Sequence, residues 1–148
     1  MKRLTLLGMT LIVLSLVVSC GKEDDSYSIT GKTKQEVFMM RTWKSTSWTD
    51  STSSGTIETL SDCEKDDTYT FTSKTKCLWK GNSNKCNSSE DAQAESDWSM
   101  SDPNGGKIMF QDIEWNILSL TANKIILRNF YETKTGETNT WRYTLLGQ

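Results

Sequence analysis

The order of apolar and polar residues divides the chain into a helical segment and a long stretch with the period of β-strands. Thr33-Lys34-Gln35-Glu36 has the form of a helix-capping box, a hydroxyl followed three residues later by glutamate, and apolar Val37, Phe38 and Met40 come next. We therefore expect a short N-terminal helix of about two turns.

Beyond the helix, aromatic and β-branched residues alternate with polar ones. Trp43 to Thr49 predicts a first strand, and the Ser/Thr/Gly-rich residues Asp50 to Gly55 predict a loop. Asp67 to Thr72 places Tyr69 and Phe71 on one face and threonines on the other. The same alternation predicts further strands at Lys76–Lys80, around Trp98 and Met100, at Lys107–Gln111, through Ile113, Trp115 and Ile117, from Ile125 and Leu127, and through Trp141, Tyr143 and Leu145.

Short turn-forming segments separate these strands. Gly81 to Ala94 is polar and predicts a loop, and Asp102 to Gly106 is typical of a hairpin turn. Parallel pairing needs long crossovers, which the chain lacks after residue 56, so the strands should pair antiparallel. The pattern favours an all-β fold, an antiparallel up-and-down meander of about eight strands that closes into a small barrel and so removes its edges. Such a barrel has room for interior side chains or one small ligand, and a sandwich is the alternative.

The first residues have the pattern of an export signal. Met1-Lys2-Arg3 is positive, the run from Leu4 to Val18 is largely apolar, and Val17-Val18-Ser19-Cys20 ends it with a small residue and a cysteine. An ordinary secretory signal cleaved near Ser19 and an uncleaved single-span anchor are the alternatives, although the run is short for a span.

The ending Val-Val-Ser-Cys resembles the lipobox of bacterial lipoproteins. The resemblance implies a signal peptide at residues 1–19, an acylated Cys20 as the mature N-terminus, a flexible tether over 20–36 and a folded domain over 37–148. The following Lys22-Glu23-Asp24-Asp25 resembles the export signal of surface lipoproteins, which implies an outer-membrane, lipid-anchored protein facing the cell exterior. A solvated charge run in the tether is the alternative.

Composition excludes several classes of function. The net charge is −2 without clusters of lysine and arginine, so the chain has no electrostatic footprint for a nucleic-acid partner. The sequence contains no histidine, which removes the usual general base and the usual metal ligand. We therefore expect neither an enzyme nor a cofactor.

An ordered set of segments resembles the lipocalin-like domains of bacterial surface lipoproteins, over about residues 37–146. The segments are Thr42-Trp43-Lys44, Cys63 to Asp67 leading into Tyr69-Thr70-Phe71, Lys85-Cys86 before Trp98, Trp115 to Thr121, and Lys124 to Leu127. The resemblance implies a lipocalin-like barrel. Arg41 departs from the family pattern, because lipocalins usually have glycine two residues before this tryptophan.

The same family resemblance bears on the cysteines. With Cys20 acylated, an odd number remains, so one thiol is unpaired. The family has a cysteine at each of the positions of Cys63 and Cys86, and this implies a disulfide between them. Cys77 lies within a predicted strand, where a free thiol usually acts as a small buried hydrophobe, and no base is available to activate it.

Two sets of acidic residues are candidates for a metal or catalytic site. Asp62, Glu64, Asp66 and Asp67 offer oxygens that suit calcium, but acids beside a turn more often form local turns or a solvated face, so we expect no metal site. Asp112 and Glu114 share a strand face as paired catalytic carboxylates would, but nothing nearby supports a glycosidase.

Aromatic residues are the candidates for a ligand cavity. The expected ligand-facing residues are Trp43, Tyr69, Phe71, Trp98, Trp115, Trp141 and Tyr143, whereas Trp48 and Trp79 are expected to be more exposed. Lipocalins that resemble this chain often pack a basic side chain from the last strand across the first-strand tryptophan. This implies a stack of Arg142 on Trp43, with Arg128 as the other possible partner and a solvent-facing Arg142 as the alternative.

The sequence thus predicts a membrane-tethered, non-enzymatic barrel that binds a small apolar or amphipathic ligand. The alternative is an interaction module with a filled barrel that serves as an accessory subunit of a surface protein complex. A cavity lined by apolar side chains would favour the first, and a packed interior with an exposed apolar patch would favour the second.

Replacing Cys20 with alanine should abolish palmitate labelling and release or mislocalise the protein, because the acyl chains attach through that residue. Undiminished labelling of the variant would contradict the anchor.

Replacing Lys22-Glu23-Asp24-Asp25 with alanines should protect the domain from protease added to intact cells, and unchanged cleavage would mean that these residues are only tether.

Overall fold

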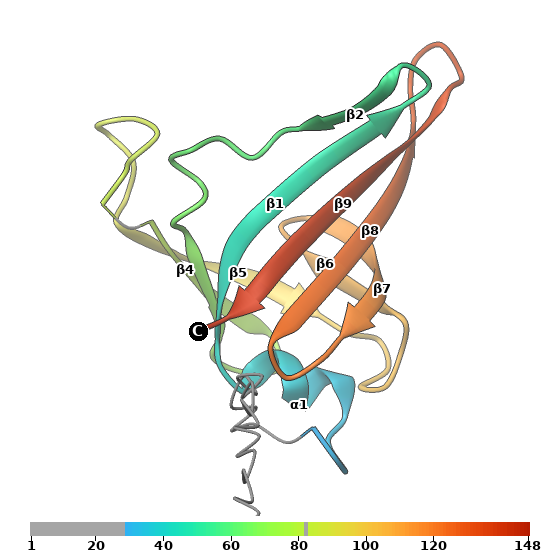
Figure 1. Ribbon diagram of the computed structural model, residues 1–148. Helices are drawn as coiled ribbons and strands as arrows, with labels where there is room; N and C mark the ends of the chain where they lie inside the picture. Colours follow the sequence, from blue (N-terminus) through green and yellow to red (C-terminus); the bar gives the residue numbers. More distant parts are fainter. Residues whose placement is uncertain (1–28, 82) are drawn as a thin grey trace, which may run out of the picture.

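The computed structural model describes residues 29–81 and 83–148 (Figure 1). The expected signal peptide, Cys20 and the charged segment Lys22 to Asp25 lie outside the described residues. The single helix of the described part, α1 (Lys34–Met39), has six residues, and no helix there is long and apolar enough to span a membrane.

Helix α1 begins at the predicted capping box. The Thr33 hydroxyl accepts a hydrogen bond from the Glu36 amide (3.2 Å), and the Glu36 carboxylate accepts one from the Thr33 amide (2.7 Å). Gln35 is buried, and its backbone N–H donates to the Pro103 carbonyl (3.0 Å). The cap and the first helical turn therefore already pack on the barrel.

Nine antiparallel strands follow: β1 (Thr42–Thr52), β2 (Gly55–Glu58), β3 (Thr68–Phe71), β4 (Lys76–Lys80), β5 (Gln93–Ser99), β6 (Lys107–Phe110), β7 (Ile113–Leu120), β8 (Lys124–Glu132) and β9 (Thr138–Gly147). β1 pairs with both β3 and β9, so β1 and β3 to β9 form a closed ring of eight strands. β2 lies outside this ring on the far half of β1 (Figure 1). The predicted meander and its closure are confirmed.

The loop predicted at Asp50 to Gly55 is shorter than expected, because only Ser53 and Ser54 form the turn. β1 continues through Thr52, and β2 returns along it as an exposed hairpin strand. The polar residues of this segment form a strand because their backbones pair on two sides: Ser51 is opposite Thr56 of β2 and Thr140 of β9.

The expected stack of Arg142 on Trp43 was also wrong. The first and last strands are neighbours, but their register places Trp43 opposite Gly147 and Arg142 opposite Thr49. Arg142 is exposed, whereas the Trp43 ring is fully buried and its indole N–H donates to the Phe38 carbonyl (2.7 Å).

A different arginine lies near the residue opposite Trp43. A side chain at position 147 would collide with the side chain of Arg41, the residue that departs from the lipocalin pattern. Arg128, the other expected partner, lies over the ring of Phe130, 4.5 Å from its centroid.

Two irregularities in the ladders keep apolar residues on the inner face. The register of β1 shifts between Ser45 and Ser47, so Trp43, Ser45 and Trp48 all point inward. A second shift in β7 leaves Leu118 exposed, so the inward alternation resumes beyond it.

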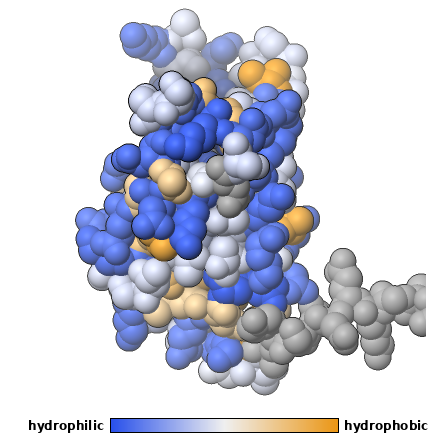
Figure 2. Space-filling view, turned by 90° about the vertical axis from the view of Figure 1, so that its left-hand side faces the viewer, coloured by the Kyte–Doolittle hydropathy of each residue, from blue (hydrophilic) through white to orange (hydrophobic). Residues whose placement is uncertain are grey.

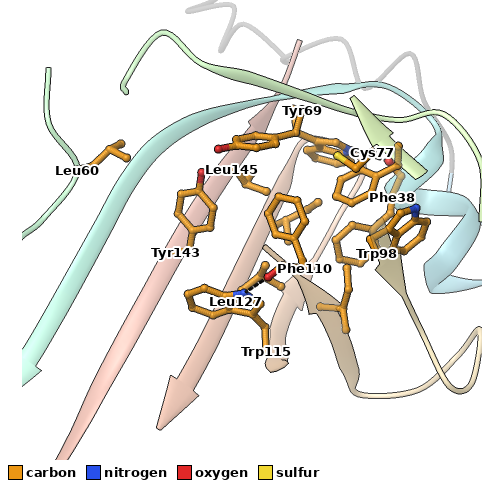
Figure 3. Close-up of a cluster of buried hydrophobic side chains, with 14 residues drawn as sticks. Phe38, Leu60, Tyr69, Cys77, Trp98, Phe110, Trp115, Leu127, Tyr143 and Leu145 are labelled. Atoms are coloured by element: carbon orange, nitrogen blue, oxygen red, sulfur yellow. Dashed lines mark hydrogen bonds between the residues drawn. The ribbon is translucent and has the colours of Figure 1, made fainter. Parts of the chain in front are cut away.

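The inside of the barrel is packed with side chains, mostly aromatic (Figure 3). Phe71 lies edge-on to Trp98, with ring centroids 4.7 Å apart, and Phe38 of α1 contacts both rings at 5.2 Å and 5.8 Å. The indole N–H of Trp115 donates to the Phe110 carbonyl (3.1 Å), and that of Trp98 to the Ser73 carbonyl (2.8 Å). The buried indoles are thus both packed and hydrogen-bonded.

Helix α1 covers one end of the barrel, while β1, β2, β8 and β9 extend beyond the other strands at the opposite end (Figure 1). Besides the Gln35 contact, the Lys34 ammonium donates to the Gly105 carbonyl (3.1 Å), so α1 is fixed to the β5–β6 turn. We call the end away from α1 the open end.

Phe38→Ala should lower the free energy of unfolding by about 3–5 kcal/mol, because it removes the ring that joins α1 to Phe71 and Trp98. Denaturant unfolding measures the change. Ile57→Ala is the control, since Ile57 is 60% exposed on β2, and it should change stability by about 0.5 kcal/mol or less. Equal effects would contradict the role assigned to the helix.

Candidate functional site

Most of the expected ligand-facing residues belong to the packed core rather than to a cavity. Six of the expected ligand-facing residues are at most 6% exposed: Trp43, Tyr69, Phe71, Trp98, Trp115 and Tyr143. A ligand in the middle of the barrel would have to displace these rings. The remaining candidate, Trp141, is only partly buried and lies at the open end.

The open end contains a pocket of about 300 Å³ that is open to solvent. Its walls are the inner faces of β3, β4 and β5, the β6–β7 turn and two loops; the lining residues are Glu64, Asp67, Tyr69, Trp79, Glu90, Ala94, Ser96 and Gln111. Trp79 was expected to be more exposed than the core tryptophans, and it is partly buried as a wall of this pocket. Tyr69 is the only expected ligand-facing residue among the lining residues of this pocket.

Asp67 is the most unusual residue of the pocket, because it is a carboxylate that is only 6% exposed. It directly precedes β3 and faces inward, in step with Tyr69 and Phe71. Its Oδ2 accepts a hydrogen bond from the indole N–H of Trp79 (2.9 Å). Burial raises the pKa of Asp67, and the charges of nearby Asp66, Glu90 and Glu64 act in the same direction.

Tyrosine and serine hydroxyl groups lie at the floor of the pocket. The Tyr69 hydroxyl accepts a hydrogen bond from the Gln111 side-chain amide (2.8 Å), and burial raises the pKa of Tyr69 to about 12. Beneath it the Tyr143 and Ser45 hydroxyls are hydrogen-bonded at 2.5 Å, and the Tyr69 and Tyr143 hydroxyls point toward one another (Figure 3). These phenols stay neutral at physiological pH, so they offer hydrogen bonds and no charge.

Gln111 reaches the pocket from a strained turn. β6 and β7 are joined by the two residues Gln111 and Asp112, both in the left-handed region with φ of 53° and 59°. Asn-Gly is the usual choice for such a turn, and a side chain there costs about 1 kcal/mol per residue. The Gln111 amide oxygen is buried and has no hydrogen-bond partner among the described residues.

The disulfide implied by the family resemblance is present between Cys63 and Cys86. It joins the two loops that carry the acidic rim of the pocket. The Glu64 carboxylate accepts from the Ser61 amide (2.9 Å), and the Glu90 carboxylate accepts from the Cys86 amide (2.8 Å). The cross-link therefore holds Glu64 and Glu90 near each other without direct pairing.

The four acidic residues considered as calcium ligands bind different partners. Asp62 pairs with Lys65 (2.7 Å), Asp66 accepts from the Asn84 amide (3.2 Å), and Glu64 and Asp67 bind as described above. Within residues 29–81 and 83–148 no three acidic or cysteine side chains are grouped to hold a metal ion.

Asp112 and Glu114, considered as paired catalytic carboxylates, lie in different surroundings. Glu114 pairs with Lys107 (2.6 Å) on the outer face of the barrel, while Asp112 lies in the β6–β7 turn.

The other half of the open end is an aromatic wall formed by Trp48, Trp141 and Tyr131. The Tyr131 ring lies 4.5 Å from that of Trp141, and Trp48 meets Trp141 edge-on at 5.9 Å. The Tyr131 hydroxyl donates to the Asp50 carboxylate (2.7 Å) and accepts from the Asn139 amide (3.0 Å). The other carboxylate oxygen of Asp50 and the amide oxygen of Asn139 are buried without a hydrogen-bond partner among the described residues. None of these side chains is among the lining residues of the pocket.

The comparisons with known proteins agree with this architecture. Residues 39–127 match the model of a family described as lipocalin-like domain, which covers more than half of the chain. The search of curated proteins finds no match. The matched segment includes α1's last residue, both disulfide cysteines and every residue that lines the pocket.

Opening the Cys63–Cys86 bond should destabilise the fold by about 3 kcal/mol, because it closes a loop with a sequence separation of 23 residues. The variant Cys63→Ser with Cys86→Ser, unfolded in denaturant, measures this change. In the same protein Cys77 should resist iodoacetamide until unfolding, because burial raises the pKa of its thiol to about 12. Rapid alkylation of folded Cys77, or a bridge that includes it, would contradict this arrangement.

Proposed function

The chain belongs to the lipocalin-like domain family, and on that premise we propose that it is a lipid-anchored binding protein of the outer membrane, facing the cell exterior. Its ligand is a small amphipathic molecule that enters the open end of the barrel. It works by binding and not by catalysis, since the sequence offers no histidine and the described fold leaves its one free cysteine buried.

The pocket beside Trp79 is the observation that carries this proposal. It is concave, the Trp79 ring forms one side of it, and polar groups of Asp67, Tyr69 and Gln111 line it. An apolar part of a ligand fits against the Trp79 ring while its polar part meets those groups. The filled core beneath limits the ligand to the mouth of the barrel.

The anchor rests on the sequence pattern that ends at Cys20. A protein held by two or three acyl chains stays on the membrane surface, and the tether before α1 lets the open end face the medium. Acyl labelling of Cys20→Ala tests this part of the proposal independently of ligand binding.

A second candidate function, an interaction module with a filled barrel, is favoured by the packed interior. Its partner would need an apolar surface, and the large exposed apolar residues are Ile29, Ile57, Met109, Leu118, Phe130 and Leu146. Ile29 and Leu118 line one hollow beside α1, and the other four lie on different elements. On the face seen in Figure 2 apolar residues are scattered among hydrophilic ones. Scattered exposure is ordinary for a soluble surface, so small-ligand binding is the better supported function.

Native mass spectrometry of protein purified from its own host should show a co-purifying small molecule. Ala94→Trp should remove it, because residue 94 lines the pocket and an indole there fills the entrance without deleting a binding group. Lys124→Trp is the control, since Lys124 is exposed at the start of β8, near α1. A small molecule retained by Ala94→Trp would contradict this pocket, and a protein partner without any small molecule would support the interaction module.

A further inference from the structure

We infer that the pocket selects a cationic ligand, a small organic amine whose ammonium group binds the Asp67 carboxylate beside the Trp79 ring. This inference rests on the proposed function and specifies the class of ligand for the same pocket. It depends on three features of the described residues: one unused carboxylate oxygen, the sign of the surrounding charge, and the position of an aromatic ring.

The first feature is the state of the Asp67 side chain. Its Oδ2 binds the Trp79 indole, but its Oδ1 accepts no hydrogen bond from any described residue, although the side chain is more than nine-tenths buried and lines the pocket. A buried carboxylate with unused acceptor capacity is costly for the fold. A donor that enters the pocket would complete its hydrogen bonding.

Gly81 lets the Trp79 ring lie close to the carboxylate. A Cβ added at Gly81 would lie 3.7 Å from Asp67 Oδ1 and 3.0 Å from the Trp79 ring, so any larger residue there would push against the ring. The glycine therefore helps to keep the ring next to Asp67.

The second feature is charge. Glu64 and Glu90 line the pocket with Asp67, and no lysine or arginine is among its lining residues. Lys65 pairs with Asp62, and the Lys85 ammonium donates to the backbone carbonyl of Glu90 (2.8 Å). Among the described residues no lysine or arginine forms a salt bridge with the carboxylates of Glu64, Asp67 or Glu90, so the pocket favours a cation over a carboxylate or phosphate.

The third feature is the ring. Because the Trp79 indole N–H is bound to Asp67, the ring and the carboxylate have a fixed relation to each other. A ligand whose ammonium group contacts the carboxylate therefore has its apolar body next to the indole, which also lines the pocket.

An organic ammonium ion fits these features better than a metal ion. No described group of three acidic or cysteine side chains is arranged to coordinate a metal, and an indole is no ligand for a hard cation. A pocket of about 300 Å³ has space for an amine with an aromatic or short aliphatic body. Such a ligand places its apolar body against Trp79 and Tyr69 and its charge at Asp67.

Three probes with the same body but different charge test the inference: phenethylamine, 2-phenylethanol and 3-phenylpropanoate. Calorimetric titration of the wild-type domain should show phenethylamine binding at least about tenfold more tightly than the neutral alcohol, and the anion not binding. Asp67→Asn keeps the shape and an acceptor for Trp79, and it should remove the preference for the amine. Glu114→Gln is the matched control on the outer face and should leave binding unchanged.

The pH dependence gives a second readout. Burial and the neighbouring acids raise the pKa of Asp67, so amine binding should weaken as pH falls through that raised value, while the amine itself stays protonated. Asp67→Asn should remove that contribution and should unfold at the same or a higher temperature at neutral pH, because it removes a destabilised charge. A markedly lower unfolding temperature would show that Asp67 serves the fold instead.

The outcomes separate this inference from the proposed function. Equal affinity of wild-type protein for the amine and the alcohol, or an unchanged preference in Asp67→Asn, overturns the amine assignment and leaves the pocket intact. Absence of binding by all three probes overturns it as well. The co-purification experiment with Ala94→Trp decides separately whether the pocket binds a small molecule.

Discussion

The backbone pairing of β1 with β9 is the constraint on which the rest of the structure depends. It joins the two ends of the meander, so every inward side chain meets a side chain from the opposite wall instead of water. Ser45 and Tyr143, 98 residues apart, share a hydrogen bond inside the barrel only because the ring is closed. The shift of register near Ser45 belongs to the same constraint, because it keeps both Trp43 and Trp48 directed inward along a strand that must bend.

Closure around so many aromatic residues determines where function is located. The rings of α1, β3, β5, β6 and β7 occupy the space in which other eight-stranded barrels hold a ligand, and α1 covers the end next to them. In this barrel the described core is therefore filled by its own side chains. The opposite end lacks such a cover, and the aromatic packing there gives way to carboxylates, amides and hydroxyls.

The polar groups of the open end fall into two sets that differ in their access to solvent. Tyr131, Asp50 and Asn139 bind one another, although one oxygen of Asp50 and the amide oxygen of Asn139 are buried without a hydrogen-bond partner among the described residues. Asp67 and Gln111 instead line a pocket that is open to solvent, one as a carboxylate bound to an indole and one on a strained turn. Strain and incomplete hydrogen bonding lower the stability of the fold at both places, and the second lies in a pocket that a ligand can enter.

The sequence alone determined the strand positions, the helix cap and the closed meander, because periods of alternation and capping depend on neighbours in the chain. It did not reveal β2 or the last residues of β1, where polar side chains carry no apolar signal and pairing on both sides decides the structure. It placed Asp67 in an acidic surface segment and Arg142 beside Trp43. Only the tertiary structure buried the first against Trp79 and moved the second away, because register and burial depend on residues that are distant in the chain.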